Sequence, residues 1–517
     1  MLFEQPISNL SFWQWLRMDQ ENKRLLWISA ITILIQFIVF KAFYPLPNFM
    51  PPDSFYYLDA AYHNQTINFW AIGYSKFLRL FSSFTNSDLV LVIGQYLILE
   101  VSLLYFLFSV RYLTAPKIWT FRILLGISIL NPLLTHISNF ISSDGLFTAL
   151  SLCWFTQLLF ILYKPSLRLL LSHSLVLLLA FMVRYNAIYY PFISIGCILL
   201  AHMSQKIKWV GITALTLLLG GFIGRTQYEY YKMTGTVQYS AFGGWQLAAN
   251  ALYGYAHARP DATESIPPKF RTLHSIVNHH MDSLNKLFFI FRPDLDIGVY
   301  YLWDGKSPLK VYLAKHRPND TLTPYFNRWA AVAPLYASYG RYIIFHHPRT
   351  FLKYFVWSNF VKYYVPPAGF MEDYNGGEDV VAPIASTWFG WKDNKIYNNF
   401  GNKKIRIAKA FPLILAMSNF IFVISFIGFT GLGGFKKCSV QSRRILFLTL
   451  IVWGSNMIFS VLSAPIELRY QLFPMVLTCT ILFLLLSFIV SESRAGNADQ
   501  KMDHGNDQNK TPSIQII

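Results

Sequence analysis

The chain carries about ten long apolar runs, and most approach the roughly 20 residues that a helix needs to cross a hydrocarbon core about 30 Å thick. By apolar length they cover residues 25–44, 89–110, 118–136, 145–163, 168–183, 187–203, 209–225, 407–430, 445–462 and 470–490. Of the 517 residues, 54% are hydrophobic and only 14% are charged, which agrees with several spans. The sequence therefore predicts an all-α polytopic membrane protein with about ten transmembrane helices.

Basic residues mark one side of the membrane. The short loops on that side contain no acidic residue and hold Arg111, Lys117, Arg122, Lys164, Arg168, Lys206, Lys208, Lys436, Lys437, Arg443 and Arg444. Since cytoplasmic loops are enriched in Lys and Arg, we expect these loops and both termini on the cytoplasmic side of a plasma (bacterial inner) membrane. Loop charge and anionic lipid also account for the net charge of +18, so nucleic acid is not expected as a partner.

This topology divides the chain into four parts. Residues 1–225 form an N-terminal transmembrane module with a first outer loop, 45–88, and the first span is retained because no cleavage signal follows it. Residues 226–406 form a mostly helical or mixed region on the outer face, and residues 407–491 return to the membrane. Residues 492–517 are polar and lack periodicity, which predicts a disordered cytoplasmic tail.

The cytoplasmic loops exclude some chemistries. At about 15 residues or fewer, they leave no room for a Rossmann or P-loop domain, and the pattern GxxxxGK[ST] is absent from the sequence. Nucleotides and nucleotide-sugars are therefore poor candidates for the substrate. The four cysteines have no CxxC spacing, and His279, His280 and Asp282 do not share one helical face, so no zinc site is expected.

Five ionisable residues from separate parts of the chain fall at the outer ends of the spans: Asp53, Asp144, Arg184, Glu467 and Arg469. Ionisable groups at membrane depth are costly unless they pair or line a wet cavity. The alternative is that each one snorkels from an ordinary interfacial turn. Because the cytoplasmic turns carry no matching acidic residues, we interpret the five as one site on the outer face.

The first outer loop begins with the stretch PLPNFMPPDSFYYLDAAYH. Its prolines end the preceding helix and place Asp53 or Ser54 where either one caps a short helix, which by itself would account for Asp53. Residues 67–84 have apolar positions near helical spacing and predict a helix lying in the interface. A carboxylate in this loop would face both a lipid-borne and a water-borne reactant.

Further ionisable residues lie outside this group. In YIIFHHPRTFLKYF, His346, Arg349 and Lys353 recur at helical spacing and are candidates to face a phosphate, although an interfacial helix with snorkelling cations is the alternative we favour. Glu100 lies in the middle of an apolar run, and we expect it to pair inside the helix bundle.

Five motifs occur in a set order along the chain: PPDSFYYLDAA (51–61), AIGYSKFL (71–78), SSDGLFTAL (142–150), MVRYNAIYYP (182–191) and ELRYQLFP (467–474). Together they resemble the GT-C superfamily of integral-membrane glycosyltransferases, which includes the protein O-mannosyltransferases and the lipid A aminoarabinose transferases. The resemblance covers the N-terminal half well and residues 226–406 hardly at all.

The resemblance implies an enzyme that moves a sugar from a polyprenyl-phosphate donor to a lipid, glycan or protein acceptor at the outer face, in contact with membrane lipids. It implies Asp53 as the general base, and Arg184 and Arg469 as cations that bind the donor phosphate. Supporting positions are Glu467, which would orient one of these arginines, and Asp144, Asp59, Tyr57 and Tyr470. The best-known members have Asp-Glu where this chain has Asp53-Ser54, so adjacent carboxylates holding a metal are not implied, and a divalent cation stays open as a cofactor.

Two other functions stay open. A transporter or flippase of a lipid-linked saccharide would need a midplane site on broken helices and often an internal repeat, and apart from Glu100 the sequence has neither. A polymerase or ligase of lipid-linked glycans would differ only in its acceptor.

Overall fold

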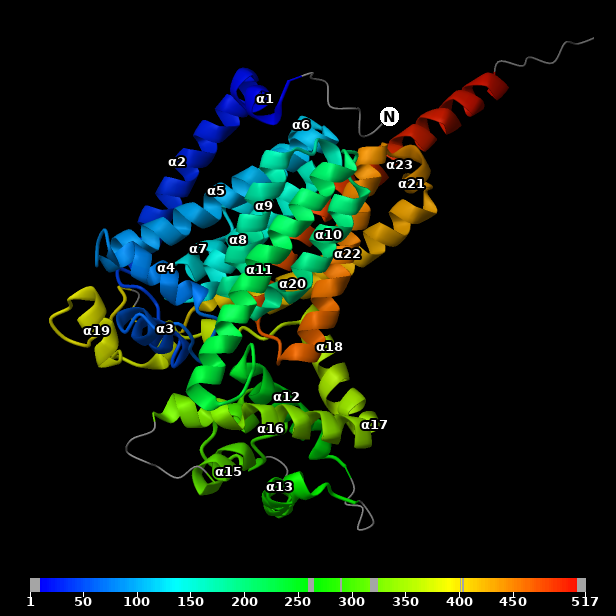
Figure 1. The fold of residues 1–517 in the computed structure, drawn as a ribbon. Helices are drawn as coiled ribbons and strands as arrows, with labels where there is room; N and C mark the ends of the chain where they lie inside the picture. Colours follow the sequence, from blue (N-terminus) through cyan, green and yellow to red (C-terminus); the bar gives the residue numbers. More distant parts are fainter. Residues whose placement is uncertain are drawn as a thin grey trace, which may run out of the picture.

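The computed structural model describes residues 10–258, 265–288, 291–316, 324–399, 401 and 404–508. Within these ranges the protein is built from helices and contains no β-strand beyond three isolated bridges. Eight of the described helices are long and apolar enough to cross a membrane. The prediction of an all-α polytopic membrane protein is therefore confirmed for the described residues (Figure 1).

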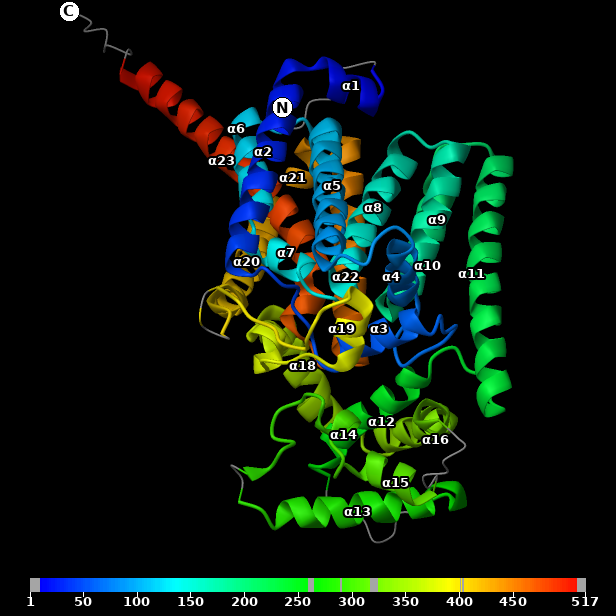
Figure 2. The same cartoon turned by 90° about the vertical axis from the view of Figure 1, so that its left-hand side faces the viewer.

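Each predicted apolar run falls on a helix. The eight long ones are α2 (Gln20–Phe43), α5 (Asp88–Thr114), α6 (Ile118–Ile129) with α7 (Pro132–Ser138), α8 (Ser143–Tyr163), α11 (Gln205–Thr234), α20 (Arg406–Gly431), α22 (Val440–Ser463), and η7 (Leu468–Gln471) with α23 (Leu472–Gln508). Two runs form shorter helices, α9 (Leu167–Val183) and η1 (Tyr185–Tyr189) with α10 (Tyr190–Leu200). These two lie beside the long helices in the same bundle (Figure 2).

The helix α11 continues to Thr234 and leads into a second layer of helices beyond one end of the bundle (Figures 1 and 2). This layer contains α12 (Ala241–Tyr255), α13 (Arg271–Asn285), α14 (Tyr300–Trp303), α15 (Pro308–His316), α16 (Tyr325–His346), α17 (Pro348–Phe351) and α18 (Trp357–Tyr364). The short helices α3 (Asp53–Tyr62), α4 (Gly73–Ser82) and α19 (Pro383–Phe389) lie between the layer and the bundle. At the opposite end lie α1 (Phe12–Met18) and α21 (Gly434–Lys437).

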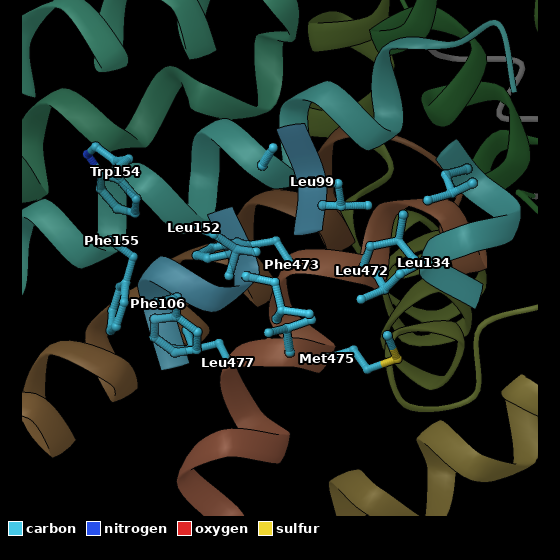
Figure 3. Packing of buried hydrophobic residues seen from close by; sticks show 14 of the residues in the cluster. Leu99, Phe106, Leu134, Leu152, Trp154, Phe155, Leu472, Phe473, Met475 and Leu477 are labelled. Carbon is cyan, nitrogen blue, oxygen red and sulfur yellow. The ribbon is translucent and has the colours of Figure 1, made fainter. Parts of the chain in front are cut away.

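Two helices form the centre of the bundle. In the most apolar stretch of α8 and of α23, 72% of the residues are buried, against 22% in α2 and in α11. The helices α2 and α11 therefore lie at the outside of the bundle, where they face lipid. Figure 3 shows Leu152 and Phe155 of α8 packed among Phe106 of α5 and Phe473 and Leu477 of α23. The segments that carry Asp144 and Arg469 therefore start from the most firmly packed part of the protein.

Small residues set the spacing inside the second layer, which we call the outer layer because it lies beyond the end of the bundle, where α12 packs along α16. A Cβ on Gly244 would lie 2.2 Å from the carbonyl oxygen of Ala333, and a Cβ on Gly340 would lie 2.9 Å from the backbone nitrogen of Ala248. The two backbones can approach this closely only because both positions lack a side chain. One face of α12 is thereby fixed against α16, and another is left to face the bundle.

Two expectations from the sequence differ from the structure. The sequence predicts a disordered tail over residues 492–517, but the helix α23 continues to Gln508. Extending an existing helix avoids the cost of nucleating a new one. Residues 509–517 lie outside the described residues. Glu100 is buried, but neither of its carboxyl oxygens has a hydrogen-bond partner among the described residues, so the expected pairing is wrong. The hydroxyls of Tyr96 and Ser102 on the same helix donate to backbone carbonyls instead.

Candidate functional site

Backbone pairing holds the loop between α2 and α3 against the segment that leads into α8. The N–H of Asn48 donates to the carbonyl of Asn139 (2.8 Å), and the N–H of Ile141 donates back to the carbonyl of Asn48 (2.9 Å). The side-chain oxygen of Asn48 also accepts from the N–H of Asn375 (2.6 Å). These bonds bring the start of α3, and with it Asp53, to the end of the bundle where α8 begins.

Asp53 is the first residue of α3, but its carboxylate does not cap the helix. Pro52 occupies the N-cap without a side-chain hydrogen bond, and the hydroxyl of Ser54 accepts from the N–H of Met50 (2.8 Å). The capping interpretation of Asp53 and Ser54 is therefore wrong. The Asp53 carboxylate pairs instead with the guanidinium of Arg469, whose Nη1 donates to Oδ2 (2.9 Å).

Arg469 lies at the centre of the site, and its donors are almost fully occupied. Besides Asp53, it donates from Nε to Oε2 of Glu467 (2.8 Å) and from Nη2 to the hydroxyl of Tyr470 (2.9 Å). Its Nη1 also lies 2.6 Å from the sulfur of Met50 and 3.9 Å from Oδ2 of Asp144. A guanidinium held by this many partners has a fixed orientation.

Arg184 is the second cation of the site, and part of its guanidinium makes no hydrogen bond to a described residue. Its Nη1 pairs with Oδ1 of Asp144, and its guanidinium carbon lies 4.9 Å from the centre of the Tyr470 ring. Within the described part of the chain, Nε and Nη2 of Arg184 donate to no acceptor. These two atoms form one edge of the planar guanidinium, the edge that binds phosphate or carboxylate in a bidentate manner.

A close backbone contact positions Arg184. It follows directly after α9, and a Cβ on Gly73 would lie 2.5 Å from the carbonyl carbon of Met182 and 2.7 Å from the nitrogen of Val183. The start of α4 therefore rests on the last turn of α9, which only glycine allows.

The cluster contains three carboxylates and two guanidiniums, an excess of one acid. Burial raises the pKa of Asp53 and of Glu467, and the guanidinium of Arg469 opposes the rise in both cases. Burial lowers the pKa of Arg184, but the Asp144 carboxylate together with Tyr470 and Tyr57 raises it by more, and the pKa ends above its ordinary value. Both guanidiniums are therefore charged, and Asp53 is an acid that takes up a proton more readily than an ordinary carboxylate.

A cavity of about 430 Å³ lies against this cluster. Its walls come from the end of the bundle and from α12 and α14 of the outer layer. Polar residues at the end of the bundle line one part of it: Asp53, Tyr57, Asp144, Arg184, Asn186, Glu467, Arg469 and Tyr470. Gln246 and Asn250 line it from α12. Apolar residues also line the cavity, among them Ile188 and Leu462, which are 45% and 48% exposed.

The structure brings most predicted site residues to this cavity, and it leaves others outside. Tyr57 lines it and hydrogen-bonds the hydroxyl of Ser143 (3.0 Å). Asp59 is not among the lining residues; its side chain is 45% exposed and contacts His63. His346, Arg349 and Lys353 are also exposed and away from the cavity. They do not share one helix, because α16 ends at His346 and α17 begins after it at Pro348.

Further lining residues lie in two aromatic and glycine-rich stretches, GGWQLAANALYGYAHARP and PPAGFMEDYNGGEDVVAP, which in the sequence are compatible either with a sugar platform or with loop turns. Phe370 lines the cavity, and its ring centre lies 5.7 Å from the guanidinium carbon of Arg469. Before it, Gly369 has a φ of 56°, and a Cβ there would lie 3.0 Å from the carboxyl carbon of Glu467. The Pro-Pro-Ala-Gly stretch 366–369 is a turn signal that could have marked a close approach, but it does not name the partner.

The residues of the site do not fit a divalent cation. Among the residues that the structure describes, no three His, Cys, Asp or Glu side chains are placed to hold a metal ion. Each carboxylate of the cluster faces a guanidinium instead.

Comparison of the chain with protein-family models, with curated proteins and with solved structures finds no match.

Proposed function

We propose that the protein is a glycosyltransferase that moves a sugar from a polyprenyl-phosphate donor to an acceptor at the outer face of the membrane. One observation carries the proposal: a carboxylate suited to act as a base and a cation with free donors line the same cavity at the end of a helix bundle. The acceptor is a lipid, a glycan or a protein. The cytoplasmic orientation of the basic loops and of both termini belongs to this proposal.

Asp53 is the general base. Its Oδ2 is held by Arg469, while its Oδ1 accepts no hydrogen bond from a described residue and remains able to accept one from an acceptor hydroxyl. Its raised pKa brings the carboxylate closer to the basicity that proton transfer near neutral pH requires. Glu467 shares Arg469 with Asp53 and is a positioning residue.

Arg184 binds the donor phosphate. Its free Nε and Nη2 can contact two phosphate oxygens, whereas the donors of Arg469 are already committed. We therefore assign the two arginines different tasks. The isoprenoid chain of the donor would leave the cavity past Ile188 and Leu462 and reach the lipid.

In the reaction, the acceptor oxygen attacks the anomeric carbon of the donor sugar and gives its proton to Oδ1 of Asp53. The bond between that carbon and the phosphate oxygen breaks, and its electron pair stays on the phosphate. The leaving polyprenyl phosphate gains negative charge, which Arg184 stabilises. Each turnover thus forms one glycosidic bond and releases one polyprenyl phosphate.

The release of polyprenyl phosphate is a test that needs no knowledge of the sugar or the acceptor. The purified protein, reconstituted in vesicles, is incubated with a panel of short-chain polyprenyl-phosphate monosaccharides and an extract of envelope lipids and glycans. Mass spectrometry should detect polyprenyl phosphate with the wild-type protein and at least about 100-fold less with Asp53→Asn. Equal release from both would refute the proposal.

A transporter or flippase of a lipid-linked saccharide is the other candidate, because Glu100 is a buried acid in the middle of α5 with no partner among the described residues. A transporter would move the labelled donor across the vesicle membrane without releasing polyprenyl phosphate. The same vesicles therefore distinguish the two functions.

A further inference from the structure

The wall of the cavity formed by the outer layer carries aromatic and amide side chains, whereas the wall opposite carries the ion cluster. The face of α12 that lines it presents Phe242, Gln246 and Asn250, which are four residues apart. Trp70, from the segment between α3 and α4, and Trp303 of α14 complete this wall. We call these five residues the α12 wall.

Three half-buried aromatic rings gather in the α12 wall. The ring centre of Trp70 lies 4.7 Å from that of Phe242 and 5.8 Å from that of Trp303. Lys310 contacts the Trp303 ring, with Nζ 4.9 Å from the ring centre, and so supports it from inside the outer layer. The aromatic part of the wall is therefore fixed before any ligand arrives.

A fixed amide lies beside the rings. Asn250 donates from Nδ2 to the backbone carbonyl of Ser463 (2.9 Å), and its Oδ1 accepts from Nε2 of Gln246 (2.8 Å). Both amides are more than nine-tenths buried. This chain of bonds sets the orientation of the Gln246 amide, and among the described residues nothing donates to its Oε1. An amide oxygen that faces a cavity without a protein donor can accept a hydrogen bond from a ligand or from water.

Aromatic rings beside a fixed amide oxygen suit a sugar ring. The C–H face of a pyranose is apolar and packs on an aromatic ring, while its hydroxyls need acceptors such as an amide oxygen. An isoprenoid chain offers no hydroxyl, and a phosphate would be repelled by Oε1 of Gln246. We propose that the α12 wall is the saccharide subsite of the cavity, with Gln246 accepting a hydrogen bond from a sugar hydroxyl. This inference rests on the proposed function, because it assigns the sugar to one wall and the reacting phosphate to the other.

The test separates the sugar from its carrier. The affinity of the reconstituted protein is measured for polyprenyl-phosphate mannose and polyprenyl-phosphate arabinose, and for polyprenyl phosphate without a sugar. If the subsite holds the donor sugar, Gln246→Met should weaken binding of the sugar-bearing lipids roughly 3- to 10-fold and leave that of the sugar-free lipid unchanged. If it holds the acceptor sugar, donor affinity is unchanged and the KM for a saccharide acceptor rises by a similar factor, measured with a panel of methyl glycosides.

Two further variants keep the result interpretable. Phe242→Leu retains apolar volume but removes the ring face, and it should change the same constants as Gln246→Met. Gln441→Met makes the same substitution at the opposite end of the bundle and should change none. If both wall variants leave donor affinity and acceptor KM at wild-type values, the inference is wrong while polyprenyl phosphate release still supports the transferase. If sugar-dependent binding is lost as expected but no polyprenyl phosphate is released, the subsite stands and the proposed function fails.

Discussion

Nη1 of Arg469 lies 2.9 Å from Oδ2 of Asp53, although the two residues are 416 positions apart in the chain. Both side chains are largely buried, at 9% and 15% exposed, so the contact is shielded from solvent. It joins the loop before α3 to the last membrane helix and holds one oxygen of the carboxylate, while no described residue donates a hydrogen bond to the other. The first prediction follows from that division.

Replacing Asp53 by Asn should abolish transfer without preventing folding. Asparagine keeps the shape of the side chain and can still accept the hydrogen bond from Arg469, but it cannot take up the proton of the acceptor. We expect wild-type expression and donor binding, and transfer slowed at least about 100-fold. Single-turnover release of polyprenyl phosphate measures this step.

Asp59→Asn is the matched control for that variant, because Asp59 lies on the same helix, is exposed and does not line the cavity. Its rate should stay within a few-fold of wild type. A reversal of the two results would assign the base to Asp59.

Arg184→Lys should weaken donor binding specifically. Lysine keeps the charge opposite Asp144 but loses the guanidinium edge that is free to contact phosphate. We expect the affinity for polyprenyl phosphate to fall by about 1–3 kcal/mol. The same substitution at Arg349, which is exposed and outside the cavity, should leave the affinity unchanged. If only Arg349→Lys weakened binding, the phosphate site would lie at α17 and not at Arg184.

Arg469→Leu should lower the stability of the protein as well as its activity. It leaves the buried carboxylates of Asp53 and Glu467 without their shared partner, which typically costs about 3–5 kcal/mol. Thermal unfolding in detergent measures the loss. Adding Glu467→Gln should restore part of it, because one buried charge is removed. Purely additive losses in the double variant would show that the pair is not energetically coupled.

Gly73→Ala should disturb the site through the backbone. The new methyl group would clash with Met182 and Val183 and push the last turn of α9, and Arg184 with it, away from α4. Overpacking of this kind costs about 1–3 kcal/mol, and transfer should fall with stability. Gly196→Ala, in the neighbouring helix α10 with no atom within 4 Å of the added Cβ, is the control and should be neutral.

The raised pKa of Asp53 predicts opposite responses of rate and stability to pH. The base works only when deprotonated, so the rate should rise with pH through the raised pKa, above the ordinary carboxyl range. The folded protein binds a proton there that the unfolded chain has already released, so the stabilising contribution present at low pH is lost as pH rises through the same pKa. In Asp53→Asn both responses should flatten, and an unchanged stability profile would assign the proton to Glu467, whose pKa is also raised.

Much of the site could be located from the sequence, because the turns that carry Asp53, Asp144, Arg184, Glu467 and Arg469 all follow from counting apolar runs. Their pairing could not be read in this way. Glu467 had Arg469 and Arg184 as equivalent partners in the sequence, and only the packed structure selects Arg469. The helical spacing of His346, Arg349 and Lys353 does not place them on one helix, because Pro348 begins a new helix between them, as a proline at that position indicates in the sequence.

The sequence by itself determined the fold class, the helices of the bundle and the end at which charged residues gather. These are local properties, since a run of apolar residues must form a helix in lipid to satisfy its own backbone. The tertiary structure alone decided that Arg469 is committed to two carboxylates while Arg184 keeps an edge free, and that α12 turns Gln246 toward the same cavity. Such relations depend on how helices distant in sequence pack together, and no spacing along the chain specifies them.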